Sequence, residues 1–395
     1  MLKINAPPSK SYTLRGMVLA ALSDKPTLLT NPLYCEDTEV LTNALERMGV
    51  KAEKRGDDLL LIPPDRLRAP TKPVFLGNSG AALRFLIAMS LLIDGDLSLT
   101  GTDALMRRPS PALISALRSL GAAVLEEEIS DCPPLRITLP KHPAKRDVEI
   151  DPSVSGQQVS ALLLVASRLP EGLAVKLTKP PPSEPYIEMT VDALKAFGVS
   201  VERPRNLTYE VQHATPSCSE YRIEGDHSSA AFLYAAAWLL KKEIEVQGLR
   251  EDSRQGDRIF PDLLQRLESG KAEYFLRDTP DLVPPLAACA LFSPGGARIE
   301  GIGHLRYKES DRIGVLASEL KKVGAVLRVG PDFMEIDPLE ASRPAAMDPH
   351  GDHRMAMAFG LLSLRIPGVE IADRSCVGKS FPDFWKCLNQ IAENI

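Results

Sequence analysis

Ala193-Leu-Lys-Ala-Phe-Gly198-Val-Ser-Val is the stretch that decides the fold, because close copies of it recur along the chain. The copies are Ala44-Leu-Glu-Arg-Met-Gly49, Ala116-Leu-Arg-Ser-Leu-Gly121 and Glu319-Leu-Lys-Lys-Val-Gly324, with a looser copy that ends at Gly270. Each copy ends a helix with glycine, the favoured residue at a helix C-terminus, and then begins a strand. Successive copies lie roughly 55 to 80 residues apart, so each repeat is too long for a solenoid and resembles a small α/β module.

The repeats also divide the chain. A predicted helix over Phe384–Ile395 completes a sixth module, so that three modules precede residues 203–226 and three follow them. This segment is polar and contains two prolines, which favours a domain boundary. A chain of 395 residues is also too long for one ordinary core, and we expect two domains.

Composition restricts the class of protein. The chain is 44% hydrophobic and 25% charged, as in soluble globular proteins, and its net charge of −5 argues against nucleic-acid and acidic-membrane partners. The six cysteines form no Cys-x-x-Cys pair, so we expect reduced thiols and no zinc site. The N-terminus has no long apolar region like that of a signal peptide, and we expect a cytoplasmic protein.

Four apolar segments without charged residues are predicted to be buried helices: 159–165, 230–240, 282–292 and 355–364. Each begins beside hydroxyl, carboxylate or guanidinium groups. Because helix N-termini carry positive partial charge, several of them facing one cleft would attract an anionic ligand.

The most highly charged stretch is His304-Leu-Arg-Tyr-Lys-Glu-Ser-Asp-Arg312, which precedes an amphipathic pattern over 313–323. Ser310 and Asp311 suit the start of that helix. Lys308 and Arg312 are cationic donors beside it, and Glu309 is a carboxylate that can give or take a proton. A solvated helix cap is the alternative interpretation.

Similar polar clusters open helices in the first half. Lys10, Ser11 and Arg15 supply a cation, a hydroxyl and a forked donor, which suit a phosphate or carboxylate. Ordinary serine capping is the alternative there. The stretch Gly77-Asn78-Ser79-Gly80 permits close approach of a ligand to the backbone, or is simply a glycine-rich turn.

In order along the chain, these motifs resemble those of the 5-enolpyruvylshikimate-3-phosphate synthase family of enolpyruvyl transferases. The resemblance covers nearly the whole chain and is specific as a set. Its carriers are Lys10-Ser11…Arg15, Gly77-Asn78-Ser79-Gly80…Arg84, Arg108-Pro109, Ser153-Val-Ser155-Gly-Gln157, Ser183-Glu-Pro185-Tyr186, Gln255-Gly256-Asp257, Lys308-Glu309-Ser-Asp311-Arg312, Asp352-His353-Arg354-Met355-Ala356-Met357 and Lys379-Ser380-Phe381-Pro382.

The resemblance implies an α/β (α+β) fold of two domains, each with three βαβαββ-type units around buried helices. It places residues 9–226 in one domain and residues 1–8 with 227–395 in the other. It also implies an active site in the interdomain cleft, with domain closure when ligands bind.

The family's chemistry is transfer of the enolpyruvyl group of phosphoenolpyruvate to the 5-hydroxyl of shikimate 3-phosphate, with release of phosphate, in aromatic amino acid biosynthesis. It proceeds by addition to a tetrahedral intermediate and elimination. The resemblance implies no cofactor and no metal, and a monomeric cytoplasmic enzyme whose partners are these two small substrates.

The resemblance also assigns residues. The implied catalytic group is Lys10, Asp281, Glu309 and Lys308, with Asp281 as base towards the hydroxyl and Glu309 as proton donor to the methylene. The implied ligands of shikimate 3-phosphate are Lys10, Ser11, Arg15, Ser155, Gln157, Ser183, Tyr186, Asp281 and Lys308. The implied ligands of phosphoenolpyruvate are Lys10, Asn78, Gly80, Arg108, Gln157, Arg312, Arg354 and Lys379.

The chain departs from the commonest family pattern at Gly156, Ala81, Phe85 and His304, where Ser, Thr, Pro and Asn are frequent. One alternative function is that of UDP-N-acetylglucosamine enolpyruvyl transferases, which usually carry a reactive cysteine near the position of Arg107-Arg108-Pro109. A second alternative is a non-catalytic binding protein of the same fold. It would be expected to have lost some of the catalytic side chains, which are all present.

Overall fold

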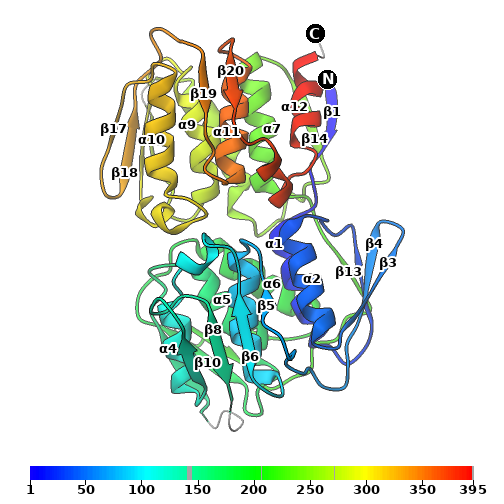
Figure 1. Cartoon of the computed structure of the whole chain (residues 1–395). Coiled ribbons are helices and arrows are strands. Elements are labelled where there is room, and N and C mark those ends of the chain that lie inside the picture. Colours follow the sequence, from blue (N-terminus) through cyan, green and yellow to red (C-terminus); the bar gives the residue numbers. More distant parts are fainter. Residues whose placement is uncertain (140–144, 206, 271, 394–395) are drawn as a thin grey trace. The chain divides into compact units, whose positions relative to one another are not determined.

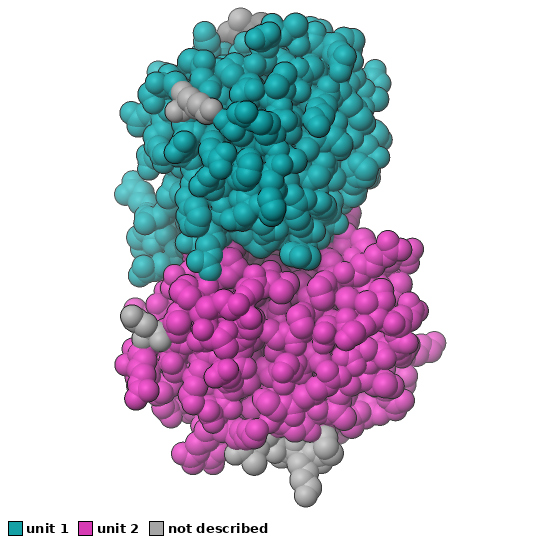
Figure 2. All heavy atoms as spheres, turned by 90° about the vertical axis from the view of Figure 1, so that its left-hand side faces the viewer, with its two compact units in different colours: residues 1–7, 225–395 teal, residues 8–224 magenta. Residues whose placement is uncertain are grey.

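The computed structural model of the protein describes residues 1–139, 145–205, 207–270 and 272–393. The chain forms two compact units, each with its own hydrophobic core. Unit 1 comprises Met1–Pro7 and Gly225–Ile395, and unit 2 comprises Pro8–Glu224 (Figure 2). No helix in the described ranges is long and apolar enough to cross a membrane.

Unit 2 contains three four-stranded sheets of the same design. In each sheet a parallel pair is extended by two antiparallel strands. In spatial order the sheets are β13 (Glu220–Arg222), β2 (Thr27–Thr30), β4 (Asp58–Ile62) and β3 (Lys51–Arg55); β5 (Val74–Phe75), β6 (Leu97–Thr100), β8 (Leu135–Thr138) and β7 (Ala123–Glu126); and β11 (Val201–Glu202), β12 (Thr208–Val211), β10 (Leu173–Leu177) and β9 (Asp147–Ile150).

Three inner helices of unit 2 pack against one another and are almost wholly buried: α1 (Lys10–Ala21), α3 (Gly80–Met89) and α5 (Gly156–Ala166). Burial follows from their composition, since most of each helix is apolar on every side. The outer helices are α2 (Glu36–Arg47), α4 (Pro111–Ser119) and α6 (Glu184–Ala196). Short 3₁₀ turns cover Ser90–Leu92 and Leu105–Arg107.

Unit 1 repeats this plan with fewer strands. Its four-stranded sheet is β15 (Ala272–Phe275), β16 (Ala297–Glu300), β18 (Phe333–Ile336) and β17 (Leu327–Val329). Two further sheets are parallel pairs, namely β1 (Leu2–Asn5) with β14 (Ile244–Gln247), and β19 (Ala345–Met347) with β20 (Val369–Ile371). In the described ranges, four modules therefore have all four strands and two have a pair.

The inner helices of unit 1 are α7 (His227–Leu240), α9 (Val283–Ala290) and α11 (His353–Ser363), which contact one another side by side (Figure 1). The outer helices are α8 (Phe260–Leu267), α10 (Arg312–Lys322) and α12 (Phe384–Glu393). Four 3₁₀ turns cover Gly256–Ile259, Pro280–Leu282, Gly303–Tyr307 and Ser375–Lys379.

The predicted buried helices are confirmed, with different ends. Three of them begin two or three residues earlier than the apolar segments, because a capping side chain starts the helix before the apolar run. The segment predicted over 282–292 is shorter as an α-helix, because a 3₁₀ turn over Pro280–Leu282 precedes it. The C-terminal helix is confirmed through Glu393, and residues 394–395 lie outside the described ranges.

The repeated helix–glycine–strand pattern is also confirmed. Gly49, Gly121, Gly198 and Gly324 each follow an outer helix with φ between 76° and 104°. Residues with a side chain rarely adopt this left-handed conformation, so the glycine ends the helix and turns the chain into the next strand.

Two strand pairs join distant parts of the sequence. β1 pairs with β14, so Leu2 lies opposite Ile244. β13 pairs with β2, so Tyr221 lies opposite Leu29. The first sheet of each unit is therefore completed by a strand from far along the chain.

Candidate active site

The charged stretch of unit 1 is organised around Arg312, the first residue of α10. Its side chain is 1% exposed and donates to Asp281 at 2.8 Å, Glu309 at 2.9 Å and Asp352 at 2.8 Å. Burial alone would lower the pKa of Arg312, but the carboxylates of Asp352, Glu309 and Asp281 outweigh it and raise that pKa. One guanidinium thus holds three carboxylates in a buried network.

Asp281 lies in the 3₁₀ turn before α9, and its second carboxylate oxygen is held by Arg354 at 2.9 Å. Thr279, not Asp281, occupies the N-cap position of that turn. Two arginines therefore hold Asp281 as a carboxylate with both oxygens fixed. An ordinary capping role does not account for this residue.

Glu309 does not cap helix α10. The N-cap of α10 is Asp311, whose side chain accepts from the Gly314 N–H at 3.0 Å. Glu309 instead contacts Arg312, and its other oxygen lies 3.8 Å from Lys379 Nζ. Its side chain is 12% exposed, so it is a largely buried carboxylate between two cations.

The residues before Glu309 form a 3₁₀ turn over Gly303–Tyr307 that ends at Lys308. Lys308 is half-buried and next to Glu309 in the chain. His304 lies in the same turn, where burial, with the nearby Lys308 as a further cause, lowers its pKa to about 3. The imidazole at this departure from the family pattern is therefore neutral at physiological pH.

Two further carboxylates belong to this network and were not assigned a role from the sequence. Asp352 is fully buried, caps α11 by accepting from the Arg354 N–H at 2.9 Å, and pairs with Arg312. Asp257 is 2% exposed and accepts from the Ser228 hydroxyl. Burial, with the Asp281 charge as a second cause, raises the pKa of Asp257 to about 7.

The motif that contains Asp257 also fixes the start of an inner helix. Gln255 accepts from the His227 N–H at 2.9 Å and donates to the Gly225 carbonyl at 2.7 Å. These bonds satisfy backbone groups at the N-terminus of α7 that otherwise lack partners. Gln255 is therefore a structural residue beside the charged network.

The candidate residues of unit 2 lie at the opening turns of its helices. Lys10 begins α1 and pairs with Asp37 at 3.0 Å, with 16% of its side chain exposed. Ser11 follows it in the first turn. Ser9 is the N-cap, so capping is done by the residue before this pair and leaves Lys10 and Ser11 available for another role.

Arg15 is buried, and burial lowers its pKa to about 10. It donates to Thr190 at 2.8 Å and to the carbonyls of Ser11 at 2.9 Å and Tyr186 at 2.8 Å. Its guanidinium also lies 5.7 Å from the centre of the Phe85 ring, where the family pattern usually has proline. Within the protein, Arg15 therefore joins the start of α1 to the start of α6.

A second group surrounds the start of α3. The Arg108 guanidinium lies against Gly80, where an added Cβ would come within 2.6 Å of it. Arg84 donates to the Gly80 carbonyl and to the Gln157 side chain, both at 3.0 Å. Asn78 lies in the turn before this helix. A side chain at position 80 would therefore force the Arg108 guanidinium to move.

The third group lies where α5 and α6 begin. Ser155 caps α5 by accepting from the Gln157 N–H at 3.2 Å. Ser183 is 7% exposed and has φ of 59°, a left-handed conformation that non-glycine residues adopt mostly at turns and functional sites. A Cβ at Gly156 would lie 3.1 Å from the Pro182 carbonyl oxygen, so the nearby loop explains the small residue at this departure.

Ion pairs of 2.8 to 3.8 Å thus join Asp281, Glu309, Arg312, Arg354 and Lys379 in unit 1. In unit 2, Arg15 links Ser11 with Tyr186, and Arg84 links Gly80 with Gln157. The sequence motif contained Arg84 but assigned it no role. In the structure its side chain connects the start of α3 with the start of α5. Ala81, the remaining departure, is half-buried on α3.

No group of three or more potential metal ligands occurs among the residues that the structure describes. None of the described cysteines forms a disulfide, and Cys35, Cys132 and Cys289 are buried.

Comparison with known proteins places these groups in a family context. The model of the family described as EPSP synthase (3-phosphoshikimate 1-carboxyvinyltransferase) matches residues 2–388. The 3-phosphoshikimate 1-carboxyvinyltransferase of Syntrophobacter fumaroxidans is 36% identical, with 98% of this chain and 96% of that protein covered. The protein of that name from Escherichia coli O6:H1 is 34% identical, with coverages of 99% and 96%.

Solved structures share the fold. EPSP synthase from Acinetobacter baumannii has a TM-score of 0.77 at 23% identity, with 98% of this chain and 95% of that chain covered. The enolpyruvyl transferase NikO from Streptomyces tendae has the same TM-score at 16% identity, with coverages of 99% and 94%.

Proposed function

This chain belongs to the EPSP synthase family, and we propose that it transfers the 1-carboxyvinyl group of phosphoenolpyruvate to the 5-hydroxyl of shikimate 3-phosphate. The product is a 5-enolpyruvyl ether, and inorganic phosphate leaves. The observation that carries the proposal for the site is the buried network in which Arg312 holds Asp281, Glu309 and Asp352.

The addition step needs a base and an acid. We assign Asp281 to accept the proton of the 5-hydroxyl as its oxygen attacks C2 of phosphoenolpyruvate. Glu309 takes up a proton before this step and donates it to the methylene carbon, which becomes a methyl group, and Lys308 and Lys10 stabilise the developing charge. The result is a tetrahedral ketal that still carries the phosphate.

In the elimination step, the carbon that gained a proton from Glu309 loses one. A methyl proton returns to Glu309 while the C2–O bond to phosphate breaks, which restores the double bond. The leaving phosphate gains negative charge, and cationic donors stabilise it best at this stage. We assign Arg312, Arg354 and Lys379 of unit 1 to this role, together with Asn78, Gly80, Arg108 and Gln157 of unit 2.

Residues at the helix starts of unit 2 suit the other substrate. Helix N-termini offer N–H groups and a positive partial charge to a phosphate. We assign Ser11, Ser155, Gln157, Ser183 and Tyr186 to shikimate 3-phosphate, with Lys10, Asp281 and Lys308. Arg15 is assigned to the same substrate, and its bonds to the carbonyls of Ser11 and Tyr186 also orient their backbone.

A phosphate-release assay tests the function. With phosphoenolpyruvate as donor, release of phosphate is expected with shikimate 3-phosphate and not with UDP-N-acetylglucosamine. The opposite preference would favour the sugar-nucleotide reaction, and release with neither acceptor would favour a binding protein.

We also propose that the enzyme acts as a monomer in the cytoplasm, without a cofactor. Six cysteines with no disulfide among the described residues support a reducing compartment. Light scattering on protein eluting from a size-exclusion column measures the molar mass. A mass of twice 43.1 kDa would contradict the monomer.

A further inference from the structure

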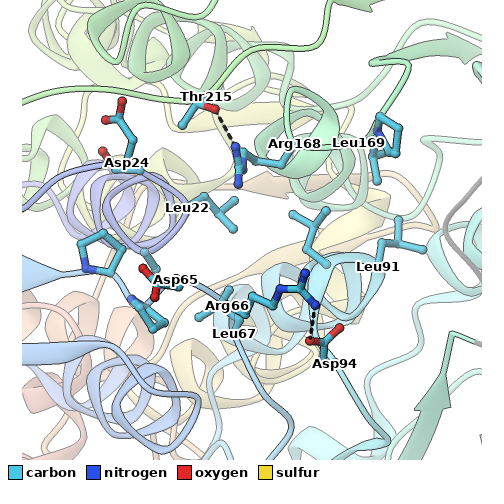
Figure 3. Close-up of a pocket in the computed structure, with 16 residues that line it drawn as sticks. Leu22, Asp24, Asp65, Arg66, Leu67, Leu91, Asp94, Arg168, Leu169 and Thr215 are labelled. Carbon is cyan, nitrogen blue, oxygen red and sulfur yellow. Dashed lines mark hydrogen bonds and ion pairs between the residues drawn. The ribbon is translucent and has the colours of Figure 1, made fainter.

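A cavity of about 570 Å³ lies in unit 2 at the ends of its inner helices (Figure 3). Its walls come from Ala21 at the end of α1 and the residues 22–24 after it, from residues 168–170 after α5, from Leu91, Leu92 and Asp94 after α3, from residues 63–67 and from Thr215. We call it the helix-end pocket. The proposed substrate residues on α1, α3 and α5 lie in the first turns of these helices, so this pocket is a separate feature.

The helix-end pocket has the size and the floor of a small-molecule site. Sites for small ligands usually measure about 300 to 1,000 Å³ and combine an apolar lining with a few polar groups. The floor here includes apolar surface of Leu92, Pro63, Pro64 and Pro170, which are half-buried or exposed. An apolar group of a ligand would remove this surface from water.

Two guanidinium groups enter the pocket. Arg168 is half-buried, and its Nη1 donates to Thr215 at 2.6 Å, which fixes its direction. Arg66 is exposed and lies 3.8 Å from Asp94, a long and weak ion pair at the surface. Each guanidinium has five N–H donors, so both retain donors for a ligand carboxylate.

Negative charge lies on another side. Asp24 and Asp65 are exposed members of the lining, and no ion pair to either occurs in the described part of the chain. Figure 3 shows both carboxylates on one side of the pocket, the two arginines nearer its centre, and Leu91 and Leu169 on the other side. The C-terminal ends of α1 and α5 lie next to lining residues and add negative partial charge.

We propose that the helix-end pocket binds a free α-amino acid with an apolar side chain. Arg168 and Arg66 bind its carboxylate, Asp24 and Asp65 bind its ammonium group, and the apolar floor receives its side chain. A simple anion is disfavoured by the helix ends and the aspartates. A simple amine leaves the arginines without a carboxylate.

The test is calorimetric titration of the full-length protein with compounds that remove one feature at a time. L-phenylalanine and L-leucine are expected to bind. Phenethylamine lacks the carboxylate, 3-phenylpropionate lacks the ammonium group and glycine lacks the apolar side chain, so each is expected to bind at least about tenfold more weakly.

Variants then locate the site. Arg168→Gln and the double change Asp24→Asn with Asp65→Asn are each expected to weaken binding of the amino acid by about 10- to 100-fold. Arg146→Gln is the matched control, because Arg146 pairs with Glu171 on the surface of the same unit and does not line the pocket. It should leave binding unchanged.

The outcomes separate this proposal from the proposed enzyme activity. Binding is measured without substrates, and none of the altered residues is assigned to the reaction. Absence of heat with both amino acids up to millimolar concentration would overturn the proposal. Equal binding of phenethylamine, or equal binding by the Arg168→Gln variant, would overturn it as well.

Discussion

Arg312 and Asp281 form a buried ion pair in which Nη1 lies 2.8 Å from Oδ1. Arg354 holds the other oxygen of the same carboxylate at 2.9 Å. A carboxylate with both oxygens fixed cannot rotate freely, so the direction in which it accepts a proton is set by the two arginines. The catalytic assignment of Asp281 therefore depends on this pair as much as on the carboxylate.

We predict that Asp281→Asn folds, still binds shikimate 3-phosphate and loses about 100- to 10,000-fold in turnover, as expected for a lost proton-transfer group. The amide keeps the shape and much of the hydrogen bonding and removes the charge. Steady-state rates with circular dichroism of the same sample measure this. Turnover near the parent level would show that Asp281 has only a structural role.

For Glu309→Gln we expect the same loss of turnover and, in addition, a steep fall in exchange of the phosphoenolpyruvate methylene protons with deuterated solvent. Proton NMR follows that exchange directly. If exchange continues at the parent rate while turnover collapses, the methylene acid is another group, with Lys10 the next candidate.

A matched control comes from the same helix start. Asp311 is the true cap of α10, so Asp311→Ala should lower the free energy of unfolding by about 1 kcal/mol and spare turnover per folded molecule. A large loss of turnover in this variant would show that any change near Arg312 disturbs catalysis.

Asp257 predicts a pH dependence of stability. Its pKa rises on folding from the ordinary acidic range to about 7, so the folded state favours its protonated form. The protonated Asp257 therefore adds to the free energy of unfolding. This added stability is fully present at pH below the unfolded pKa, near 4, and is lost as the pH rises through about 7. Urea unfolding of the parent and of Asp257→Asn from pH 4 to 8 measures this. The variant should become more stable relative to the parent as pH rises, and a constant difference would contradict the assignment.

Alkylation of thiols in the native protein should leave turnover largely intact. Burial raises the pKa of Cys35, Cys132 and Cys289, which keeps these thiols protonated and unreactive. Iodoacetamide treatment followed by a rate assay and mass spectrometry checks this. Rapid inactivation with one labelled cysteine, prevented by substrate, would favour the sugar-nucleotide alternative.

The turn between α9 and β16 predicts a costly substitution. Gly296 has φ of 70°. A Cβ added to it would lie 2.1 Å from the carbonyl oxygen of Ile336, a residue of the adjacent strand β18. Gly296→Ala should lower the free energy of unfolding by about 3 kcal/mol or more. Gly121→Ala, with φ of 98° and no atom within 4 Å of the added Cβ, should cost about 1 kcal/mol. Equal losses in urea unfolding would contradict the steric argument.

Local sequence signals predicted much of the fold. The helix–glycine–strand copies were found because a glycine with positive φ and an amphipathic helix are both local features. The inner helices were found because they lack charged residues. Pattern alone did not predict the pairing of Tyr221 with Leu29, because nothing local to either strand encodes a partner so far away.

The candidate site was predicted in part. Charged residues at helix starts singled out Arg312 and Glu309. Asp352 received no role because a capping aspartate and an ion-pair aspartate have the same sequence signal, and here one residue does both. The central place of Arg84 was also hidden, since its partners Gly80 and Gln157 come from two different helices.

The pairing of β1 with β14 sets an order of events during synthesis. Ile244, the partner of Leu2, is made 242 residues after it (244 − 2). At about 5 to 20 residues per second, the first strand therefore waits roughly 12 to 50 s before its partner exists. All of Pro8–Glu224 is made within this interval, so unit 2 has its complete chain before unit 1 can close its first sheet. Throughout this wait the apolar side of Leu2–Asn5 has no native partner, and a chaperone that binds nascent chains would meet it there.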